Sequence, residues 1–198
     1  MSRDINETRN RILNAAWKLL EAGQGSGVRM SDIAKTAGIS RQAVYLHFPT
    51  RAELLTATTR YLDEINNADE RLMASRNAAT GLERLEAFIE AWGNYIPEIY
   101  GVARALMAME DTDEAAKLAW ADRKAAIAHG CQAAVKALKN DGVLLQEHTI
   151  KEATDILFSL LSVQTWENLT QDCGWSQRQY VKKMKALAKK MLVAEKGS

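Results

Sequence analysis

The stretch VRMSDIAKTAGISRQAVYLHFPTRAELL, residues 28–55, decides the fold of this chain. An apolar face through Ile33 and Ala37 predicts a short helix, and Gly38 supplies the left-handed residue that ends it. Ser40 is placed to cap a second short helix, which begins at the next residue. A helix, a tight glycine turn and a second helix form a helix-turn-helix, whose second helix enters the DNA major groove.

Further helices are predicted on both sides of this motif. Thr50 and Glu53 form a T-x-x-E capping box at the start of a helix over residues 51–72. That helix is long enough to link a small N-terminal head to the rest of the chain. Upstream, an apolar face from Thr8 to Ala22 predicts a helix, preceded by a polar arm (residues 1–7) and followed by a loop, GQGSG (residues 23–27).

The remaining sequence is also helical in pattern. A polar break at residues 75–81 precedes a helix that ends before Pro97, and Pro97 is expected in the first turn of the next helix. The expected helices cover residues 82–96, 97–109, 114–138, 150–170 and 176–193. No strand-like alternation occurs. The sequence therefore predicts an all-α protein of about nine helices, with a three-helix DNA-binding domain (1–55) and a helical effector-binding and dimerisation domain (56–198).

Charge is distributed unevenly along the chain. The net charge is only +1, but residues 1–60 hold nine Lys/Arg against five Asp/Glu, and the other 138 residues hold 17 against 20. A basic head on an acidic body is typical of a DNA-binding module joined to a module that does not bind DNA.

Several classes of protein are disfavoured by composition. No apolar run approaches 18 residues and the N-terminus lacks an apolar signal region, so a cytoplasmic protein without a membrane partner is expected. Cys131 and Cys173 are too few for a disulfide framework. The three histidines show no metal-ligand spacing, and His129 and Cys131 diverge on their helix. We therefore expect no enzyme, metal or cofactor.

The second helix of the motif carries side chains suited to reading bases. Arg41 can bond guanine O6 and N7, and Gln42 can bond adenine N6 and N7. Arg51 begins the following helix, where a cation and a helix N-terminus both attract phosphate.

By residue identity, this region resembles the DNA-binding half of the TetR/AcrR-type family of bacterial repressors. The resembling residues are Ile33-Ala34, Ala37-Gly38-Ile39-Ser40, Val44-Tyr45, His47-Phe48, Thr50-Arg51 and Leu54-Leu55, with Thr8, Ile12, Ala15-Ala16 and Gly23 upstream. The resemblance implies phosphate contacts from Tyr45 and His47. The chain departs from the family pattern at Gln42, commonly glycine, at Arg51, commonly lysine, and at Val28-Arg29, where a hydroxyl cap is usual. The expected DNA contacts are Arg29, Ser40, Arg41, Gln42, Val44, Tyr45, His47, Thr50 and Arg51.

One short recognition helix cannot discriminate a genome's worth of sites, so we expect a homodimer on a palindromic double-stranded operator. The last two helices carry the most apolar length and, in the resembling family, form a four-helix interface between subunits. The candidate interface residues are Ile156, Leu157, Leu160, Leu161, Tyr180, Met184 and Leu187, some of which must instead form the core.

The middle helices are rich in large, adaptable side chains of the kind that line apolar pockets. The candidate ligand-binding residues are Trp92, Tyr95, Tyr100, Met107, Trp120, Phe158 and Trp166. For each one alone, an ordinary core position is the competing interpretation.

The predicted function is a transcriptional repressor released from its operator by a small hydrophobic or aromatic effector. Two alternatives remain open: a DNA-bound regulator controlled by a protein partner, and a small-molecule carrier that keeps a vestigial DNA reader. An apolar surface patch would favour the first, and loss of DNA binding with ligand binding retained would favour the second.

Overall fold

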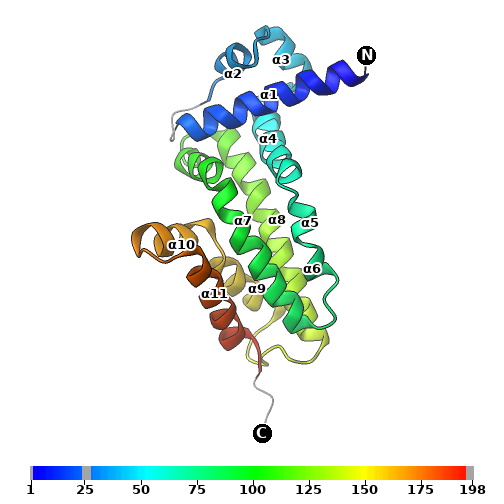
Figure 1. The fold of residues 1–198 in the computed structure, drawn as a ribbon, viewed down its shortest axis with the longest axis vertical. Coiled ribbons are helices and arrows are strands. Elements are labelled where there is room, and N and C mark those ends of the chain that lie inside the picture. Colours follow the sequence, from blue (N-terminus) through cyan, green and yellow to red (C-terminus); the bar gives the residue numbers. More distant parts are fainter. Residues whose placement is uncertain (1, 24–27, 195–198) are drawn as a thin grey trace. The chain divides into compact units, whose positions relative to one another are not determined.

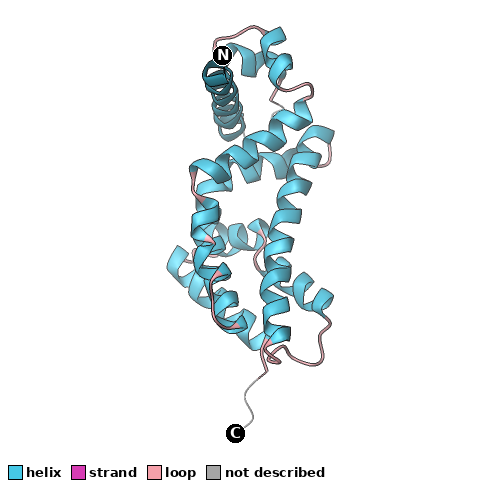
Figure 2. Ribbon diagram, turned by 90° about the vertical axis from the view of Figure 1, so that its right-hand side faces the viewer, coloured by secondary structure: helices cyan, strands magenta, loops and turns pink. Residues whose placement is uncertain are grey.

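Helices make up the regular structure of this protein in the computed structural model, which describes residues 2–23 and 28–194 (Figures 1 and 2). Within those residues the only strand-like pairing is an isolated bridge between Leu144 and Val193. The predicted all-α fold is confirmed. Most of the predicted loop at residues 23–27 lies outside the described residues.

The chain groups into two compact units. Unit 1 comprises residues 1–66 and 98–124, and unit 2 comprises residues 67–97 and 125–198. This grouping follows compactness and differs from the division at residue 55, which stays a prediction. None of the described helices combines the length and apolar character needed to span a membrane.

Unit 1 contains the head of the chain. Its first four helices are α1 (Ser2–Gly23), α2 (Met30–Ala37), α3 (Arg41–His47) and α4 (Arg51–Ile65). Helix α1 packs against α2 and α4, and α2 packs against α3 (Figure 1). The shared core includes Ile12, Ala16, Leu20, Ile33, Val44 and Leu54. The expected polar arm is helical from Ser2, because no proline or glycine interrupts the helix before Gly23.

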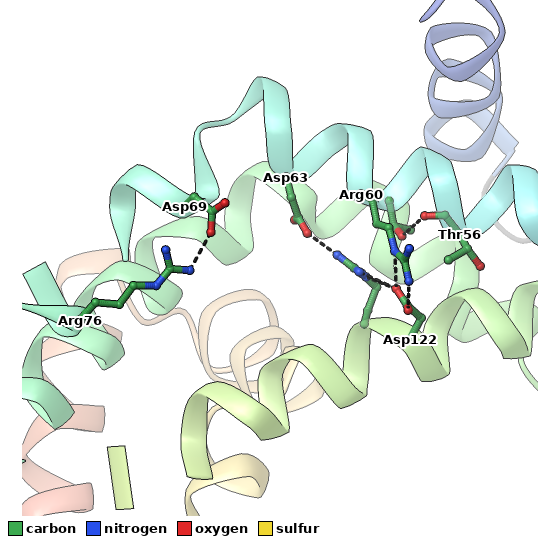
Figure 3. Close-up of polar contacts among 8 residues, drawn as sticks. Thr56, Arg60, Asp63, Asp69, Arg76 and Asp122 are labelled. Atoms are coloured by element: carbon green, nitrogen blue, oxygen red, sulfur yellow. Dashed lines mark hydrogen bonds and ion pairs between the residues drawn. The ribbon is translucent and has the colours of Figure 1, made fainter. Parts of the chain in front are cut away.

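Helix α4 is shorter than predicted. It ends at Ile65 and not near residue 72, because Asn67 adopts a left-handed conformation with φ of 52°. Two single-turn helices follow, α5 (Ala68–Arg71) and α6 (Met73–Arg76). An ion pair from Arg76 to Asp69, at 2.7 Å, joins them (Figure 3).

Helix α7 (Gly81–Met109) runs unbroken through Pro97, which corrects the predicted boundary there. A proline inside a helix leaves the carbonyl four residues earlier without its N–H donor, here the carbonyl of Gly93. The side-chain amide of Gln177 replaces that donor, with its Nε2 2.7 Å from the Gly93 oxygen. The indole N–H of Trp166 in turn donates to Gln177 Oε1 at 2.9 Å, which fixes the orientation of the amide.

This arrangement predicts a measurable coupling between Pro97 and Gln177. In urea unfolding, Gln177→Ala should cost about 2 kcal/mol, since the Gly93 carbonyl and the Trp166 N–H both lose a partner. Pro97→Ala restores a backbone N–H for Gly93, so Gln177→Ala should cost about 1 kcal/mol less in that background. The exposed Gln179→Ala on the same helix is the control. Equal costs in both backgrounds would contradict the replacement of the donor by Gln177.

The C-terminal helices of unit 2 follow α8 (Glu114–Asn140), which covers the predicted helix at 114–138 and ends before Gly142, whose φ is 68°. They are α9 (Ile150–Leu160), α10 (Val163–Glu167), a π-helical turn η1 (Asn168–Asp172) and α11 (Gln177–Leu192). The single helix predicted over 150–170 is interrupted because Ser162 caps a new one, with its Oγ accepting from Thr165 N at 3.0 Å. Ser176 caps α11, which lies within the predicted range 176–193.

Candidate nucleic-acid interface

The turn between α2 and α3 has the geometry that the glycine predicted. Gly38 is left-handed, with φ of 68°, and the N–H of Ile39 returns to the Ala34 carbonyl at 3.1 Å. Ser40 then caps α3 by accepting a hydrogen bond from Ala43 N at 3.1 Å. Because both helix ends are satisfied within six residues, the direction of α3 relative to α2 is well defined.

The exposed face of α3 carries four side chains in two columns. Arg41 and Tyr45, four residues apart, contact each other: Arg41 Nη2 lies 3.3 Å from the Tyr45 hydroxyl and the guanidinium lies over the Tyr45 ring at 5.5 Å. This hydrogen bond raises the pKa of Arg41 above its ordinary value. Gln42 and Leu46 form the second column. This face therefore presents the Arg41 guanidinium in contact with Tyr45, the side-chain amide of Gln42 and the apolar side chain of Leu46.

Val44 anchors this helix from the opposite side. Its side chain is 0% exposed, so its predicted DNA contact is corrected to a core position. Phe48, which follows α3, is also buried, and the guanidinium of Arg9 from α1 lies over its ring at 5.0 Å. Val44 and Phe48 therefore hold one side of α3 against the core of unit 1, and the polar side of the helix faces outward.

The other predicted DNA contacts near α3 lie at or near the surface. Arg29 is exposed and precedes α2, which has no side-chain cap, as the missing hydroxyl predicted. His47 is half-buried, and Ser40 and Thr50 are exposed but act as caps. At Thr50, Glu53 reaches the threonine hydroxyl at 3.1 Å, while Thr50 Oγ1 accepts from Glu53 N at 3.2 Å. Their contacts with DNA stay predictions.

Arg51 is placed differently from its prediction as a phosphate ligand. Its Nη1 lies 2.6 Å from both carboxylate oxygens of Asp113, and its Nε donates to the Val28 carbonyl at 2.5 Å. The side chain is only 23% exposed. Two of its three nitrogens are thus used within the protein, and Arg51 serves to join α4 to the start of α8.

More ion pairs join α4 to α8 along their length (Figure 3). Arg60 Nη2 lies 2.6 Å from Asp122 Oδ1, and Arg123 pairs with both Asp63 and Asp122. These neighbours lower the pKa of Asp122, with the hydrogen bond from Arg60 as the largest cause. Arg51, at the start of α4, pairs with Asp113, the residue before α8. Ion pairs therefore join both the first turn and the later turns of α4 to the first part of α8.

The predicted ligand-binding residues do not all lie in one unit. Tyr100, Met107 and Trp120 belong to unit 1, and the other four belong to unit 2. In unit 2, the Trp92 indole donates to the Leu161 carbonyl at 2.8 Å, and Trp166 donates to Gln177. Tyr95 is buried and Phe158 is half-buried. In unit 1, Trp120 is 2% exposed and its Nε1 has no hydrogen-bond partner among the described residues.

The predicted dimer-interface residues divide into core and surface. Four are fully buried within the chain, which corrects their assignment as interface: Leu157, Leu161, Tyr180 and Met184. Burial also raises the pKa of Tyr180, whose hydroxyl has no partner among the described residues. Ile156 and Leu160 are half-buried, and Leu187 is 38% exposed. An open groove of about 520 Å³ lies here, lined by Asp155, Ile156, Ser159, Leu160, Thr165 and Met191.

Two residues were not predicted from the sequence in the roles that the structure gives them. Leu46 is 82% exposed on α3. The available signal was an apolar residue outside the apolar face of its own helix. Asp113 directly precedes the predicted helix at 114–138, and no signal in the sequence linked it to Arg51. Among the described residues, no cluster of His, Cys, Asp or Glu is suited to hold a metal.

Comparison with known proteins finds matches in the N-terminal part of the sequence. Residues 12–58 match the family described as bacterial regulatory proteins, tetR family. The chain is 41% identical over 58 residues to the HTH-type transcriptional regulator CymR of Pseudomonas putida, covering 29% of each chain. It is 33% identical over 64 residues to the nucleoid occlusion factor SlmA of a Marinomonas strain, covering 32% of each. These matches span about a third of the curated relatives.

Similarity of fold extends over the whole chain. The structure matches that of NalD, the secondary repressor of the MexAB-OprM multidrug efflux pump in Pseudomonas aeruginosa, with a TM-score of 0.71 at 20% identity. The match covers 98% of this chain and 100% of NalD. At this identity the likeness concerns the fold, an N-terminal helix-turn-helix followed by a helical C-terminal part.

Proposed function

We propose that this chain, a TetR/AcrR-type regulator by its N-terminal domain and its fold, represses transcription as a homodimer on a palindromic operator until a small apolar or aromatic effector releases it. TetR-family regulators are DNA-binding transcription factors and not enzymes, in agreement with the prediction from the sequence.

The observation that carries the proposal is the exposed face of α3. Arg41, Gln42 and Tyr45 stand together on a helix that the Gly38 turn and the buried Val44 hold in place. Arginine and glutamine are the side chains that read guanine and adenine in the major groove. The excess of basic residues in the first 60 residues supplies the attraction for phosphate.

A second copy of the chain is the proposed occupant of the groove at α9 and α11. Ile156 and Leu160 stand one turn apart on α9, and Leu187 and Met191 stand one turn apart on α11. Helices α9 and α11 pack against each other, so the two apolar pairs form one surface on unit 2. An isologous contact through such a surface pairs each helix with its copy and doubles the number of readers on DNA.

The effector is proposed to bind near Trp120 in unit 1. Its indole N–H is a buried donor without an acceptor among the described residues, and a buried donor of this kind is costly to leave unpaired. The indole donors of Trp92 and Trp166 are already used within unit 2. An effector with an aromatic or apolar body and one hydrogen-bond acceptor fits this environment, with Tyr100 and Met107 as further candidates.

Release from DNA requires that the effector bind the DNA-incompetent arrangement more tightly than the competent one. The ion pairs from Arg51, Arg60 and Asp63 connect α4 to the part of α8 that carries Trp120. A shift of α8 caused by the effector would therefore displace α4 and the reading helix. A tenfold induction needs about 1.4 kcal/mol of differential binding.

The test is DNA binding by the full-length protein at two salt concentrations. The probes are duplexes that span the upstream region of its own gene and a random-sequence pool. We expect tight binding that weakens steeply with salt, and a loss of at least about tenfold in Tyr45→Ala, since a phosphate hydrogen bond and the support of Arg41 disappear. Tyr45→Phe, which keeps the ring, should bind between the two.

The same complex then serves as the probe for effectors. Apolar and aromatic compounds bearing one acceptor are screened for release of the bound duplex. Failure to bind either the upstream DNA or any duplex from the pool would refute the DNA-binding proposal and favour the carrier alternative. DNA binding that no small molecule weakens would favour control by a protein partner.

A further inference from the structure

Leu46 is the most exposed of the large apolar side chains in the described part of the chain. It is 82% exposed, against 56% for Ile5 and 50% for Leu118. It lies on α3, the helix whose other exposed side chains are the polar groups of Arg41, Gln42 and Tyr45. Nothing within the described chain covers it. An isolated exposed leucine is ordinary on a protein surface, but this one stands within the proposed reading face.

The four exposed positions of α3 are not equivalent. The Arg41 guanidinium and the Tyr45 ring and hydroxyl contact each other. Gln42 and Leu46 lie one turn apart in the neighbouring column, about 6 Å along the helix axis. A base-pair step is about 3.4 Å. Side chains with this spacing, on a helix lying in the major groove, reach bases within about two steps of each other.

The major groove presents one apolar group on the base edges, the 5-methyl group of thymine. We infer that Leu46 is a specificity-determining residue that reads a thymine methyl group, within about two base pairs of an adenine bonded by Gln42. This inference rests on the proposed DNA-binding function and adds to it the chemistry of one position in each half-site. The operator half-site thus contains an A·T-rich step beneath the Gln42–Leu46 column.

The size of the effect follows from burial of one methyl group. Removing a methyl group from an apolar contact changes a binding constant about fourfold. A dimer makes the contact twice, so the loss of both contacts changes the affinity about 15-fold. Because Leu46 is exposed and contributes no core contact, its truncation leaves the fold of α3 unchanged, and alanine is the better helix former.

The experiment uses the full-length protein and a duplex selected by the wild type from a random-sequence pool. Each thymine is replaced in turn by deoxyuridine, which lacks only the methyl group, and affinities are measured by fluorescence anisotropy at fixed salt. We expect one thymine in each half-site at which this replacement weakens wild-type binding about fourfold. Leu46→Ala should bind the parent duplex correspondingly less well and be indifferent to deoxyuridine at that thymine alone.

Matched variants separate this role from a general one. Leu46→Met keeps an apolar tip and should keep the sensitivity to deoxyuridine, whereas Leu118→Ala, an exposed leucine on α8, should behave as wild type. The inference is overturned if Leu46→Ala has the same deoxyuridine profile as the wild type, or if no thymine in the selected half-site responds. Failure of the wild type to select any duplex is a different result, since it overturns the proposed function itself.

Discussion

Gly81→Ala is expected to cost about 3 kcal/mol of unfolding free energy, although the change adds a single methyl group. A Cβ built on Gly81 would lie 2.6 Å from both Ala137 C and Leu138 N, and 2.7 Å from Ala137 O. These are backbone atoms of α8, so no side-chain rotation can make room. The first turn of α7 would have to move away from α8 and lose the hydrogen bond from Gly81 N to Asp141 Oδ2, now 2.5 Å.

The measurement is urea unfolding of wild type, Gly81→Ala and Gly142→Ala. Gly142 has open space around its Cβ position but a φ of 68°, so alanine there should cost only about 1 kcal/mol through backbone strain. A similar, small cost at both positions would show that α7 and α8 can separate easily at this point. A large loss of unfolding free energy in Gly81→Ala, but not in Gly142→Ala, would show that the backbones of α7 and α8 cannot move apart at this point without destabilising unit 2.

The helix-turn-helix was predictable because its signals are local. Gly38 and Ser40 act within four residues of themselves, and the structure places both as the sequence indicated. The same kind of signal was present elsewhere but not used. T-x-x-E also occurs at Thr80 and Thr149, where the structure has both reciprocal hydrogen bonds of a capping box, at the starts of α7 and α9.

The predictions from the sequence were wrong where a residue far away in the chain makes an interaction that local sequence rules do not include. Pro97 ought to end a helix, but Gln177, 80 residues later in the chain, supplies the missing donor. Similarly, Arg51 at a helix N-terminus suggests a phosphate ligand, but Asp113 occupies its guanidinium. No periodicity in the sequence reports such partners, because they depend on how the helices pack.

The division of apolar residues between core and surface was predictable only in part. On α11, Tyr180, Met184 and Leu187 follow one apolar stripe, yet the first two are buried and the third is exposed. A stripe indicates which side of a helix faces inward, but its width is set by the neighbouring helices. The structure leaves Leu187, a predicted interface residue, and Met191 exposed at the edge of the stripe, where they form a candidate contact surface.

Asp113 carries the second large effect, because one carboxylate performs two tasks. It receives both 2.6 Å contacts from Arg51 Nη1, and its Oδ1 accepts from the backbone N–H groups of Ala115 and Ala116 at the start of α8. Asp113→Ala should cost about 3 kcal/mol, roughly 1 from the lost cap and the rest from Arg51 left unpaired in a mostly buried site. Asp113→Asn keeps a capping oxygen and should cost about half as much.

The pH dependence of the unfolding free energy distinguishes the contribution of the Asp113 charge from that of its helix cap. Arg51 is the largest cause of the lowered pKa of Asp113, so the folded protein holds this carboxylate ionised more firmly than the unfolded chain does. The stability from this pair is therefore fully present above the unfolded value of 3.8, and it is lost as the pH falls through the lower folded value. In urea unfolding, the gap between wild type and Asp113→Asn should stay constant at neutral pH and narrow below about pH 4. A gap that persists unchanged in acid would mean that the Arg51 contact stabilises the fold without its charge. In that case the contact between Arg51 of α4 and Asp113 at the start of α8 would stabilise the protein through its hydrogen bonds alone.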